Sequence, residues 1–333
     1  MPAAVPETMT AIEIAAPGGP EMLRVATRPV PKPGKGEVLV KVEAAGVNRP
    51  DVVQRQGHYP PPPGVTDIPG LEIAGEVVAL GDAPNGIKIG DKICALLAGG
   101  GYAEQVAVPQ GQLLPVPDGV TLTDAAGLPE AACTVYANVF QQARLAPGET
   151  ILVHGGAGGI GTIAIQLAKS FGARVVCTAG TPAKLARCTE LGADLAISYV
   201  RDDFVSAVDV FTGGRGVDVI LDIVGGPYLA RNVAALATGG RLLVVSTQGG
   251  TSAELDLRML MHKRASILAS TLRARPGAEK AAIVAGVREQ VWPLVAAGRV
   301  RPVIERVLPT AEAAAAHQLL DEGTHVGKIL LVN

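Results

Sequence analysis

Residues 151–161 read ILVHGGAGGIG, an apolar run followed directly by a glycine-rich loop. The run predicts a buried strand, and the residues after the loop carry apolar side chains at helical spacing. Gly172 then ends the helix before a second apolar run at 174–178. A strand, a glycine loop, a helix and a second strand form the opening of a doubly wound α/β unit. The apolar helical positions are Ile160, Ala164, Leu167, Ala168 and Phe171.

The glycines of this loop are spaced as in a nucleotide-binding fingerprint. Gly156, Gly158 and Gly161 fit G-x-G-x-x-G, in which one glycine makes the tight turn, one admits phosphate to the backbone and one lets helix pack on strand. The amides of the new helix, at Gly159 and Ile160, would face the phosphates. A chain with 41 glycines in 333 residues also produces this spacing by chance, and the alternative is a glycine turn without a ligand. The flanking strand and helix favour a dinucleotide pyrophosphate site.

Strands and helices alternate from about residue 121 to residue 272. Six apolar runs with helical spacers predict an α/β fold, a doubly wound parallel sheet of the Rossmann kind. Pro182 in the first turn of one helix, and Gly192 at its end, fit the usual helix boundaries. The predicted strands are residues 151–153, 174–178, 195–198, 217–221, 241–245 and 266–269.

The chain before this region reads as a small, mostly β domain. Turn-forming residues at Gly81-Asp82, at Gly90-Asp91 and in the proline run 60–63 argue against helices there. Residues 1–8 are expected to form a disordered extension. The predicted strands are residues 37–45, 72–80, 91–97 and 102–108.

The tail returns to a β pattern. Runs at 303–307 and 328–332 flank a helix at 311–321, and they most economically rejoin the N-terminal β region. The expected domains are therefore residues 1–122, residues 123–272 and a return to the first domain over 273–333.

Composition and charge exclude several classes of protein. The 29 Lys and Arg residues against 31 acids give a formal net charge of −2, and no basic block is long enough to neutralise a run of phosphates. Nucleic acid is therefore not expected as a partner. The four cysteines form no C-x-x-C pair, which indicates inert thiols in a reducing compartment. No secretory signal or membrane span is apparent, so we expect a cytoplasmic protein.

The end of the second predicted strand bears on which nicotinamide cofactor is used. An NAD-selective unit places an Asp or Glu there, to accept hydrogen bonds from the ribose hydroxyls. This chain has Gly180 at that position and no carboxylate from 172 to 189, whereas Thr181 offers a hydroxyl and Lys184 an ammonium group. A 2′-phosphate would be favoured, which predicts NADPH. The alternative is that Lys184 is a solvated helix residue.

Several short motifs, taken in order along nearly the whole chain, resemble the zinc-free, zeta-crystallin-like quinone oxidoreductases of the medium-chain dehydrogenase/reductase superfamily. The resemblance implies a GroES-like catalytic domain beside the Rossmann domain. The motifs are GVNRPD at 46–51, RQGHY at 55–59, PGLE at 69–72, GGGYAE at 99–104, the glycine loop, TAG at 178–180 and GK at 327–328.

The same resemblance indicates that metal ligands are missing. Zinc-dependent relatives carry a Cys where this chain has Asn48 and a His where it has Leu71. An apolar Leu does not coordinate zinc, and an amide is a poor ligand. No metal is therefore expected, and alcohol oxidation that needs zinc to acidify a hydroxyl is disfavoured.

By resemblance, Asn48 should lie near the nicotinamide, and further residues should bind other parts of NADPH. Gly180, Lys184 and Tyr199 would surround the adenosine phosphate. The residues implied at the nicotinamide end are Thr134, Val245, Ser246, Thr247, Ser270 and Lys328.

Tyr59 is the candidate for substrate contact. Its phenol can stack on a quinone and donate a proton or hydrogen bond as the oxygen gains charge. The alternative is a loop tyrosine that merely covers a cleft. Some relatives have Ser where this chain has Gly158, so no hydroxyl is available there.

Three functions remain open at this stage. The first is an NADPH:quinone oxidoreductase. The second is an NADPH-dependent reductase of conjugated carbonyls or enoyl thioesters, for which Arg273, Arg275 and Lys280 could form a basic rim toward coenzyme A. The third is a cofactor-binding structural or RNA-associated protein, which the slightly acidic charge disfavours. A homodimer is expected through the predicted edge strand at 266–269.

Overall fold

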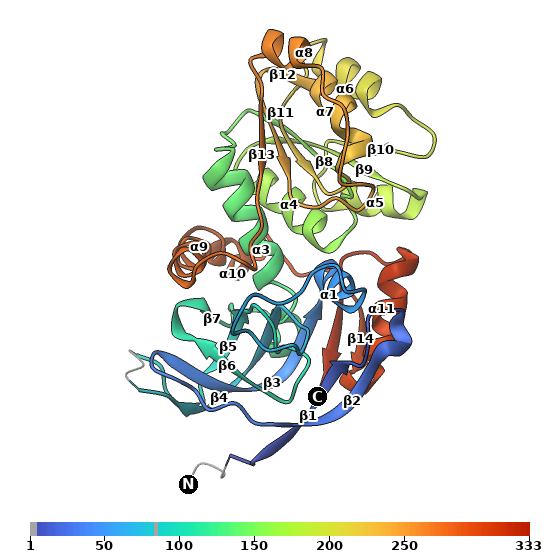
Figure 1. Cartoon of the computed structure of the whole chain (residues 1–333). Helices are drawn as coiled ribbons and strands as arrows, with labels where there is room; N and C mark the ends of the chain where they lie inside the picture. Colours follow the sequence, from blue (N-terminus) through green and yellow to red (C-terminus); the bar gives the residue numbers. More distant parts are fainter. Residues whose placement is uncertain (1–4, 83–85) are drawn as a thin grey trace. The chain divides into compact units, whose positions relative to one another are not determined.

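The computed structural model describes residues 5–82 and 86–333. The chain divides into two compact units. The first unit comprises Met1–Cys133, Leu272–Gly298 and Pro302–Asn333, and the second comprises Thr134–Thr271 and Arg299–Arg301. The N-terminal segment of the first unit thus extends to Cys133, beyond the boundary at residue 122 expected from sequence. Figure 1 shows both units with the chain coloured along its length.

The second unit is built on a six-stranded parallel sheet. Its strand order is β10-β9-β8-β11-β12-β13, the 3-2-1-4-5-6 order of a Rossmann sheet. All six predicted strands are present, although β12 begins five residues earlier than expected from the apolar run. The strands are β8 (Thr150–Val153), β9 (Arg174–Ala179), β10 (Leu195–Ser198), β11 (Val217–Asp222), β12 (Leu236–Val244) and β13 (Ser266–Ala269).

Helices connect these strands and cover the sheet (Figure 1). Right-handed crossovers place α4 and α5 on one face and α6, α7 and α8 on the other. Phe204 and Val208 of α6 pack with Leu152, Val176 and other strand residues in one buried apolar cluster. The elements are η3 (Tyr136–Gln142), α4 (Gly159–Ser170), α5 (Pro182–Glu190), α6 (Phe204–Thr212), η4 (Gly226–Tyr228), α7 (Leu229–Ala235) and α8 (Leu257–Lys263).

The first unit is built on a mostly antiparallel sheet. Its order is β14-β15-β3-β4-β5-β7, and β6 pairs with β3 off that path. The four strands predicted in the N-terminal region are confirmed with small shifts, whereas β1, β2 and β7 were not predicted. The strands are β1 (Thr8–Ile14), β2 (Leu23–Pro29), β3 (Glu37–Val47), β4 (Glu72–Leu80), β5 (Lys92–Leu96), β6 (Gln105–Pro109), β7 (Leu113–Pro115), β14 (Ile304–Pro309) and β15 (Lys328–Val332).

The return of the tail to the first sheet is confirmed. β15 pairs with β3 in antiparallel register, from Ile329 opposite Val47 to Val332 opposite Ala44. In Figure 1 the last strands therefore lie beside strands from the beginning of the chain. Ala316 and Leu320 of the predicted C-terminal helix pack in the same apolar core.

Two expectations for the N-terminal region are wrong. The turn-rich composition argued against helices, but α1 forms because Asn48 and Asp51 make a reciprocal capping box and Pro50 starts the helix. The expected disordered extension is too long, since Thr8 opens β1 and the Glu7 carbonyl accepts a hydrogen bond from the Val30 amide. Residues 1–4 of that extension lie outside the described residues.

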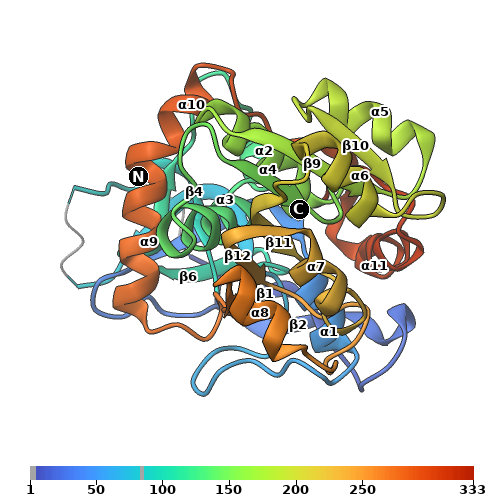
Figure 2. The ribbon, with the colours of Figure 1, turned by 90° about the horizontal axis from the view of Figure 1, so that it is seen from above.

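The remaining helices of the first unit are short, apart from α9 and α11. α9 is followed by α10, as Figure 2 shows. Within residues 5–82 and 86–333, no helix is both long and apolar enough to cross a membrane. The elements are η1 (Pro20–Met22), α1 (Arg49–Arg55), η2 (Gln110–Gln112), α2 (Leu122–Ala125), α3 (Pro129–Val135, which enters the second unit), α9 (Gly277–Gln290), α10 (Trp292–Ala296), η5 (Thr310–Glu312) and α11 (Ala313–Glu322).

Candidate functional sites in the two units

The glycine loop joins β8 to the N-terminus of α4, as predicted. Gly158 is the N-cap of α4, and the Gly156 amide donates to the Thr178 carbonyl at 2.9 Å. A Cβ on Gly161 would clash with the Gly155 carbonyl and lie 2.7 Å from the Gly156 Cα. Close packing of helix on loop therefore requires glycine at 161.

Gly158 lies in a more open part of the same loop. A Cβ there would meet nothing nearer than the Gly155 carbonyl oxygen, at 3.4 Å. Its φ of −79° is one that any residue adopts. The backbone beside Gly158 is thus accessible at the N-terminus of a 12-residue helix, where amides and the helix dipole favour an anion. These residues fit a dinucleotide pyrophosphate.

The other predicted cofactor residues of the second unit gather at one edge of its sheet. Each group directly follows the carboxyl end of a parallel strand, and these ends share one edge, where ligands of open α/β sheets bind. Gly180 follows β9, Tyr199 follows β10, residues 245–247 follow β12 and Ser270 follows β13. The strand order reverses between β8 and β11, so the glycine loop lies at the switch point.

The residues predicted near the adenosine phosphate lie close together. A Cβ on Gly180 would be 2.5 Å from the Tyr199 phenol oxygen, so this half-exposed ring lies directly against Gly180. Thr181 caps α5 by accepting a hydrogen bond from the Lys184 amide at 3.3 Å. The Lys184 side chain is partly exposed, and the Cys188 thiol lies within reach of its charge.

Thr134 and Ser270 are joined through a residue that the sequence argument missed. Asn138 donates from Nδ2 to the Thr134 carbonyl at 2.8 Å and accepts at Oδ1 from the Ser270 hydroxyl at 2.6 Å. Asn138 lies in the π-helical segment η3, where its spacing of four residues from Thr134 was the available signal. Its buried amide holds two candidate nicotinamide residues together.

In the first unit, Asn48 and Lys328 belong to one buried polar cluster with Glu72. Lys328 is 3% exposed at its side chain, forms an ion pair with the fully buried Glu72 and donates to Asn48 Oδ1 at 2.7 Å. Asn48 Nδ2 donates to Glu72 Oε1 at 2.9 Å and to the Gly46 carbonyl at 3.2 Å. Every polar group of the Asn48 side chain is therefore engaged within the protein.

Asp51, which was not predicted as a site residue, lies next to this cluster and hydrogen-bonds to the Asn48 backbone. Its buried carboxylate accepts from the amides of Asn48 at 2.8 Å and Gly70 at 3.1 Å, and from the Tyr102 hydroxyl at 3.2 Å. Burial raises the pKa of Asp51 to about 6, against the lowering effect of the two amides. The Tyr102 hydroxyl also lies 3.0 Å from Nε2 of His317, a buried histidine whose pKa burial lowers to about 3. Asp51 thus connects the Asn48 backbone to the loop at Gly70 and to Tyr102.

Glu130 is a second buried carboxyl group that the sequence argument missed. Its amide donates to Glu72 Oε2 at 2.9 Å, which brings two acids together. Burial, and then the charge of Glu72, raise the pKa of Glu130 to about 8. Burial and the neighbouring Glu72 therefore favour the protonated form of Glu130.

Tyr59 is half-buried in the loop between α1 and β4. Burial and the charge of Glu130 raise the pKa of its phenol, and the guanidinium of Arg273 lowers it. The Arg273 guanidinium carbon lies 5.3 Å from the centre of the Tyr59 ring. The phenol therefore keeps its proton at neutral pH and can act as a donor.

The basic rim considered for a coenzyme A substrate is not formed as expected. Arg273 is 4% exposed and Lys280 is 7% exposed, and Lys280 donates to the Arg273 carbonyl at 3.3 Å. Of the three residues proposed for that rim, only Arg275 is more than slightly exposed. Buried cations that already have partners do not make an electrostatic surface for coenzyme A.

The residues at the position of the relatives' zinc ligands do not fit a zinc ion. Asn48 accepts a hydrogen bond from the Lys328 ammonium, which also pairs with the neighbouring Glu72, and the apolar side chain of Leu71 is buried. A fixed positive charge in this cluster opposes a divalent cation. In the described part of the chain, no three His, Cys, Asp or Glu residues are grouped so that they could hold a metal.

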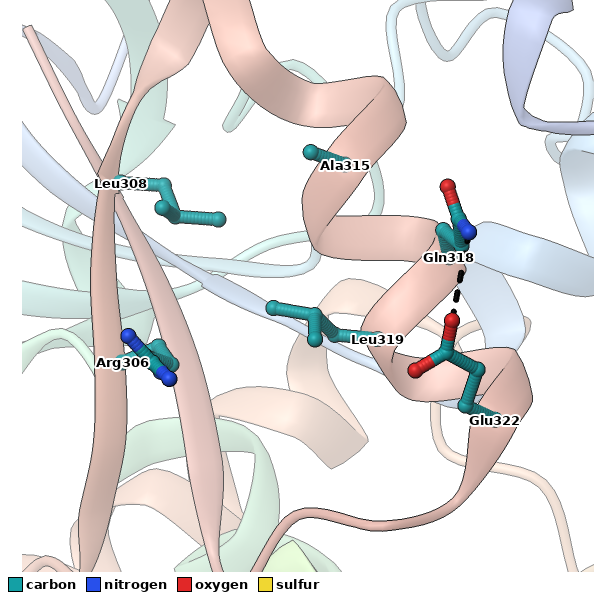
Figure 3. Close-up of a pocket in the computed structure, with 6 residues that line it drawn as sticks. All are labelled: Arg306, Leu308, Ala315, Gln318, Leu319 and Glu322. Atoms are coloured by element: carbon teal, nitrogen blue, oxygen red, sulfur yellow. Dashed lines mark hydrogen bonds between the residues drawn. The ribbon is translucent and has the colours of Figure 1, made fainter.

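A groove of about 360 Å³ on the first unit is separate from these residues. It lies between β14 and α11, and the side chains that line it include none of the predicted site residues (Figure 3). Gln318 donates to Glu322 at 3.2 Å along its helical wall. Its lining residues are Arg306, Leu308, Ala315, Gln318, Leu319 and Glu322.

Comparison with known proteins identifies two family matches. Residues 34–118 match the alcohol dehydrogenase GroES-like domain, and residues 159–285 match the zinc-binding dehydrogenase family. The chain is 31% identical to the quinone oxidoreductase of Rattus norvegicus over 330 residues, which covers 97% of this chain and 98% of the relative.

Solved structures agree with this relationship over nearly the full length. Mycobacterial Rv1454c complexed with NADPH has a TM-score of 0.86 at 31% identity, covering 98% of this chain and 100% of the other. An NAD-dependent alcohol dehydrogenase has a TM-score of 0.86 at 32% identity, with the same coverage of 98% and 100%. These neighbours confirm a Rossmann-type and a GroES-like domain. Similarity alone does not distinguish the two nicotinamide cofactors.

Proposed function

Because this chain belongs to the quinone oxidoreductases of the medium-chain dehydrogenase/reductase superfamily, we propose that it reduces quinones with NADPH and without zinc. It is an oxidoreductase with a nicotinamide-dependent fold. The observation that carries the finer proposal is the buried cluster of Lys328, Glu72 and Asn48. It supports a protein that keeps a fixed ammonium group where zinc-dependent relatives coordinate their metal.

This cluster favours one class of acceptor. A Lewis acid is needed to polarise an unreactive carbonyl or to acidify an alcohol. The Lys328 ammonium is held by two partners inside the protein, so it does not replace that function for a substrate. The acceptor must therefore be electrophilic by itself, as a quinone is, and the protein contributes binding and orientation.

The residues after β9 favour NADPH over NADH. Gly180 and Tyr199 form a contact, and Thr181 starts the helix that carries Lys184. With no carboxylate between 172 and 189, the adenosine ribose meets a hydroxyl and an ammonium group. These groups would hydrogen-bond a 2′-phosphate and would leave the 2′-hydroxyl of NADH without an acidic partner.

Bound NADPH supplies a hydride, and this chain's residues handle the remaining proton. Reduction of a quinone to a quinol needs one hydride and one proton, and Tyr59 carries a phenolic proton at neutral pH. As hydride reaches the quinone, the phenol would donate to the oxygen that gains charge. Tyr59 would then recover its proton from solvent.

The test is consumption of NADPH by the purified protein with 1,2-naphthoquinone, repeated with NADH and with a short enoyl-coenzyme A. We expect turnover with the quinone and a preference for NADPH. Elemental analysis of the same preparation should give far less than one zinc per chain. Turnover with only the enoyl thioester, or one zinc that is required for activity, would contradict the proposal.

A further inference from the structure

Arg273 follows directly on the chain's return from the second unit to the first, and its guanidinium is engaged by three separate pieces of the first unit. Nε donates to the Ala98 carbonyl at 2.6 Å, and one terminal nitrogen donates to Gln54 Oε1 at 2.7 Å. The other terminal nitrogen donates to the Tyr59 carbonyl at 3.2 Å. A charged group that is 4% exposed needs such partners, because an unpaired buried charge is very costly.

The loop that carries Tyr59 has few backbone interactions of its own. It runs from the end of α1 to the start of β4 without a helix or strand, and residues 60–63 are four prolines, which lack amide donors. The His58 amide donates to the Val53 carbonyl and the Gly57 amide to the Gln54 carbonyl, and the Tyr59 carbonyl itself accepts from Arg273. Arg273 binds the Tyr59 carbonyl and Gln54, and so connects the loop to α1.

The same guanidinium also faces the Tyr59 ring. Its carbon lies 5.3 Å from the ring centre, within range of a cation–π interaction. The Arg273 charge favours the phenolate and so lowers the pKa of Tyr59, against burial and the charge that Glu130 on α3 carries once it is ionised. Arg273 thus influences both where Tyr59 lies and how readily it releases its proton.

We propose that Arg273 is a positioning residue for quinone reduction, which holds Tyr59 in place through its carbonyl and keeps a positive charge against its ring. The inference rests on the proposed function. When hydride from NADPH adds to the quinone, the phenol O–H bond breaks and a new O–H bond forms on the quinol. The guanidinium stabilises the phenolate until solvent returns a proton, so one quinone, one NADPH and one proton give one quinol and one NADP⁺.

The experiment is a double-mutant cycle on Arg273 and Tyr59, read by steady-state kinetics with 1,2-naphthoquinone. We expect Arg273→Gln to lower kcat about tenfold, which corresponds to about 1.4 kcal/mol, and to leave KM for NADPH unchanged. In the Tyr59→Phe background the same substitution should have little further effect, since it acts through the phenol. Arg273→Lys keeps the charge but not the planar set of hydrogen-bond donors, so its kcat should lie between those of wild type and Arg273→Gln.

Arg288→Gln is the matched control, because this exposed arginine on α9 loses a charge without touching Tyr59. It should behave as wild type. An equal loss of kcat from Arg273→Gln in both backgrounds would overturn the inference, as would a Tyr59→Phe variant with wild-type kcat. If Arg273→Gln does not fold, Arg273→Lys provides the same comparison.

A second readout does not depend on quinone turnover. The phenol pKa can be followed by NMR of tyrosine labelled at the Cζ carbon, with the Tyr59 signal assigned from Tyr59→Phe. Removal of the guanidinium should raise that pKa, and an unchanged value would overturn the inference. If the wild-type protein reduces no quinone but the pKa rises in Arg273→Gln, the proposed function fails while the link between Arg273 and Tyr59 stands.

Discussion

The glycine loop of the second unit and the buried Lys328 cluster of the first unit are organised in opposite ways. In the loop, the important atoms are backbone atoms within about ten residues, and Gly161 is needed because a side chain would strike the neighbouring turn. In the cluster, the important atoms are side-chain atoms, and Lys328 reaches Asn48 across 280 positions of sequence. The comparison teaches that a site made from local backbone is visible as a motif, whereas a site made from distant side chains is not.

The largest expected effect is on the side-chain site. Lys328→Met leaves the fully buried Glu72 without its cation and Asn48 Oδ1 without its donor. Breaking a buried ion pair from one side costs about 3–5 kcal/mol, so the free energy of unfolding should fall by that amount in urea titrations. Lys41→Met on β3 removes an exposed lysine from the same sheet and should change it by less than about 0.5 kcal/mol. Equal losses of unfolding free energy in Lys328→Met and Lys41→Met would show that the cluster does not cause the destabilisation.

The second prediction concerns pH and Glu130. Because burial raises the folded-state pKa of Glu130 from 4.5 to about 8, the folded protein keeps a proton that the unfolded chain releases. The resulting stability is full below pH 4.5 and is lost as the pH rises to 8, at about 1.4 kcal/mol for each pH unit. Between pH 6 and pH 8, wild type should lose about 2–3 kcal/mol more than Glu130→Gln, which cannot titrate. Parallel urea curves for the two proteins across this range would contradict the prediction.

The third prediction concerns the second unit, at the sheet edge where side chains as well as backbone atoms would bind the cofactor. Lys184→Ala removes a charged hydrogen-bond donor worth about 1.5–3 kcal/mol, so the preference for NADPH over NADH should fall about 10- to 150-fold. Fluorescence titration with both cofactors measures this ratio. Arg187→Ala on the same helix breaks only an exposed ion pair with Glu190 and should leave the ratio unchanged. An unchanged ratio in Lys184→Ala would remove the assignment of the 2′-phosphate site.

The smallest effects are expected within the glycine loop, and they should differ between two of its glycines. Gly161→Ala forces a Cβ against the Gly155 carbonyl, and such overpacking costs about 1–3 kcal/mol, which should weaken NADPH binding about 5- to 150-fold. Gly158→Ala meets only an ordinary contact at 3.4 Å and should bind NADPH within about threefold of wild type. If both variants bind equally, the loop is not held by the packing described.

Elements that depend on periodicity and turn chemistry over consecutive residues were predicted correctly. The six strands of the parallel sheet, the helix after the glycine loop and the return of residues 328–332 to the first sheet all follow from such patterns. The short helix α1 was missed, because its seven residues depend on the capping pair Asn48 and Asp51 rather than on an apolar repeat. β1 and β2 were missed because they form a separate two-stranded sheet, in which β2 has a single buried residue and no apolar alternation to mark it.

The candidate site residues likewise divide into those that a local sequence motif marks and those that it does not. Gly156, Gly158 and Gly161 were found by spacing, whereas Asn138 and Glu130 lie in none of the motifs, and Asp51 lies in the motif at 46–51 without any sign there that it is buried. Arg273 was considered for a basic rim under the alternative function, and the structure instead buries it beside Tyr59. A charged residue in a sequence reads as a surface residue, because charges are rarely buried unless they are paired.

Alternation of strand and helix, glycine spacing and the absence of a carboxylate after β9 can be read without coordinates, because each is a property of consecutive residues. They are enough to indicate a nicotinamide-dependent α/β oxidoreductase. The cluster of Lys328, Glu72 and Asn48, the raised pKa of Glu130 and the hydrogen bond from Arg273 to Tyr59 arise only when distant segments meet. Burial is what gives these groups their character, since the exclusion of water makes an ion pair strong and an unpaired carboxylate costly, and only the tertiary structure decides which side chains lose their water.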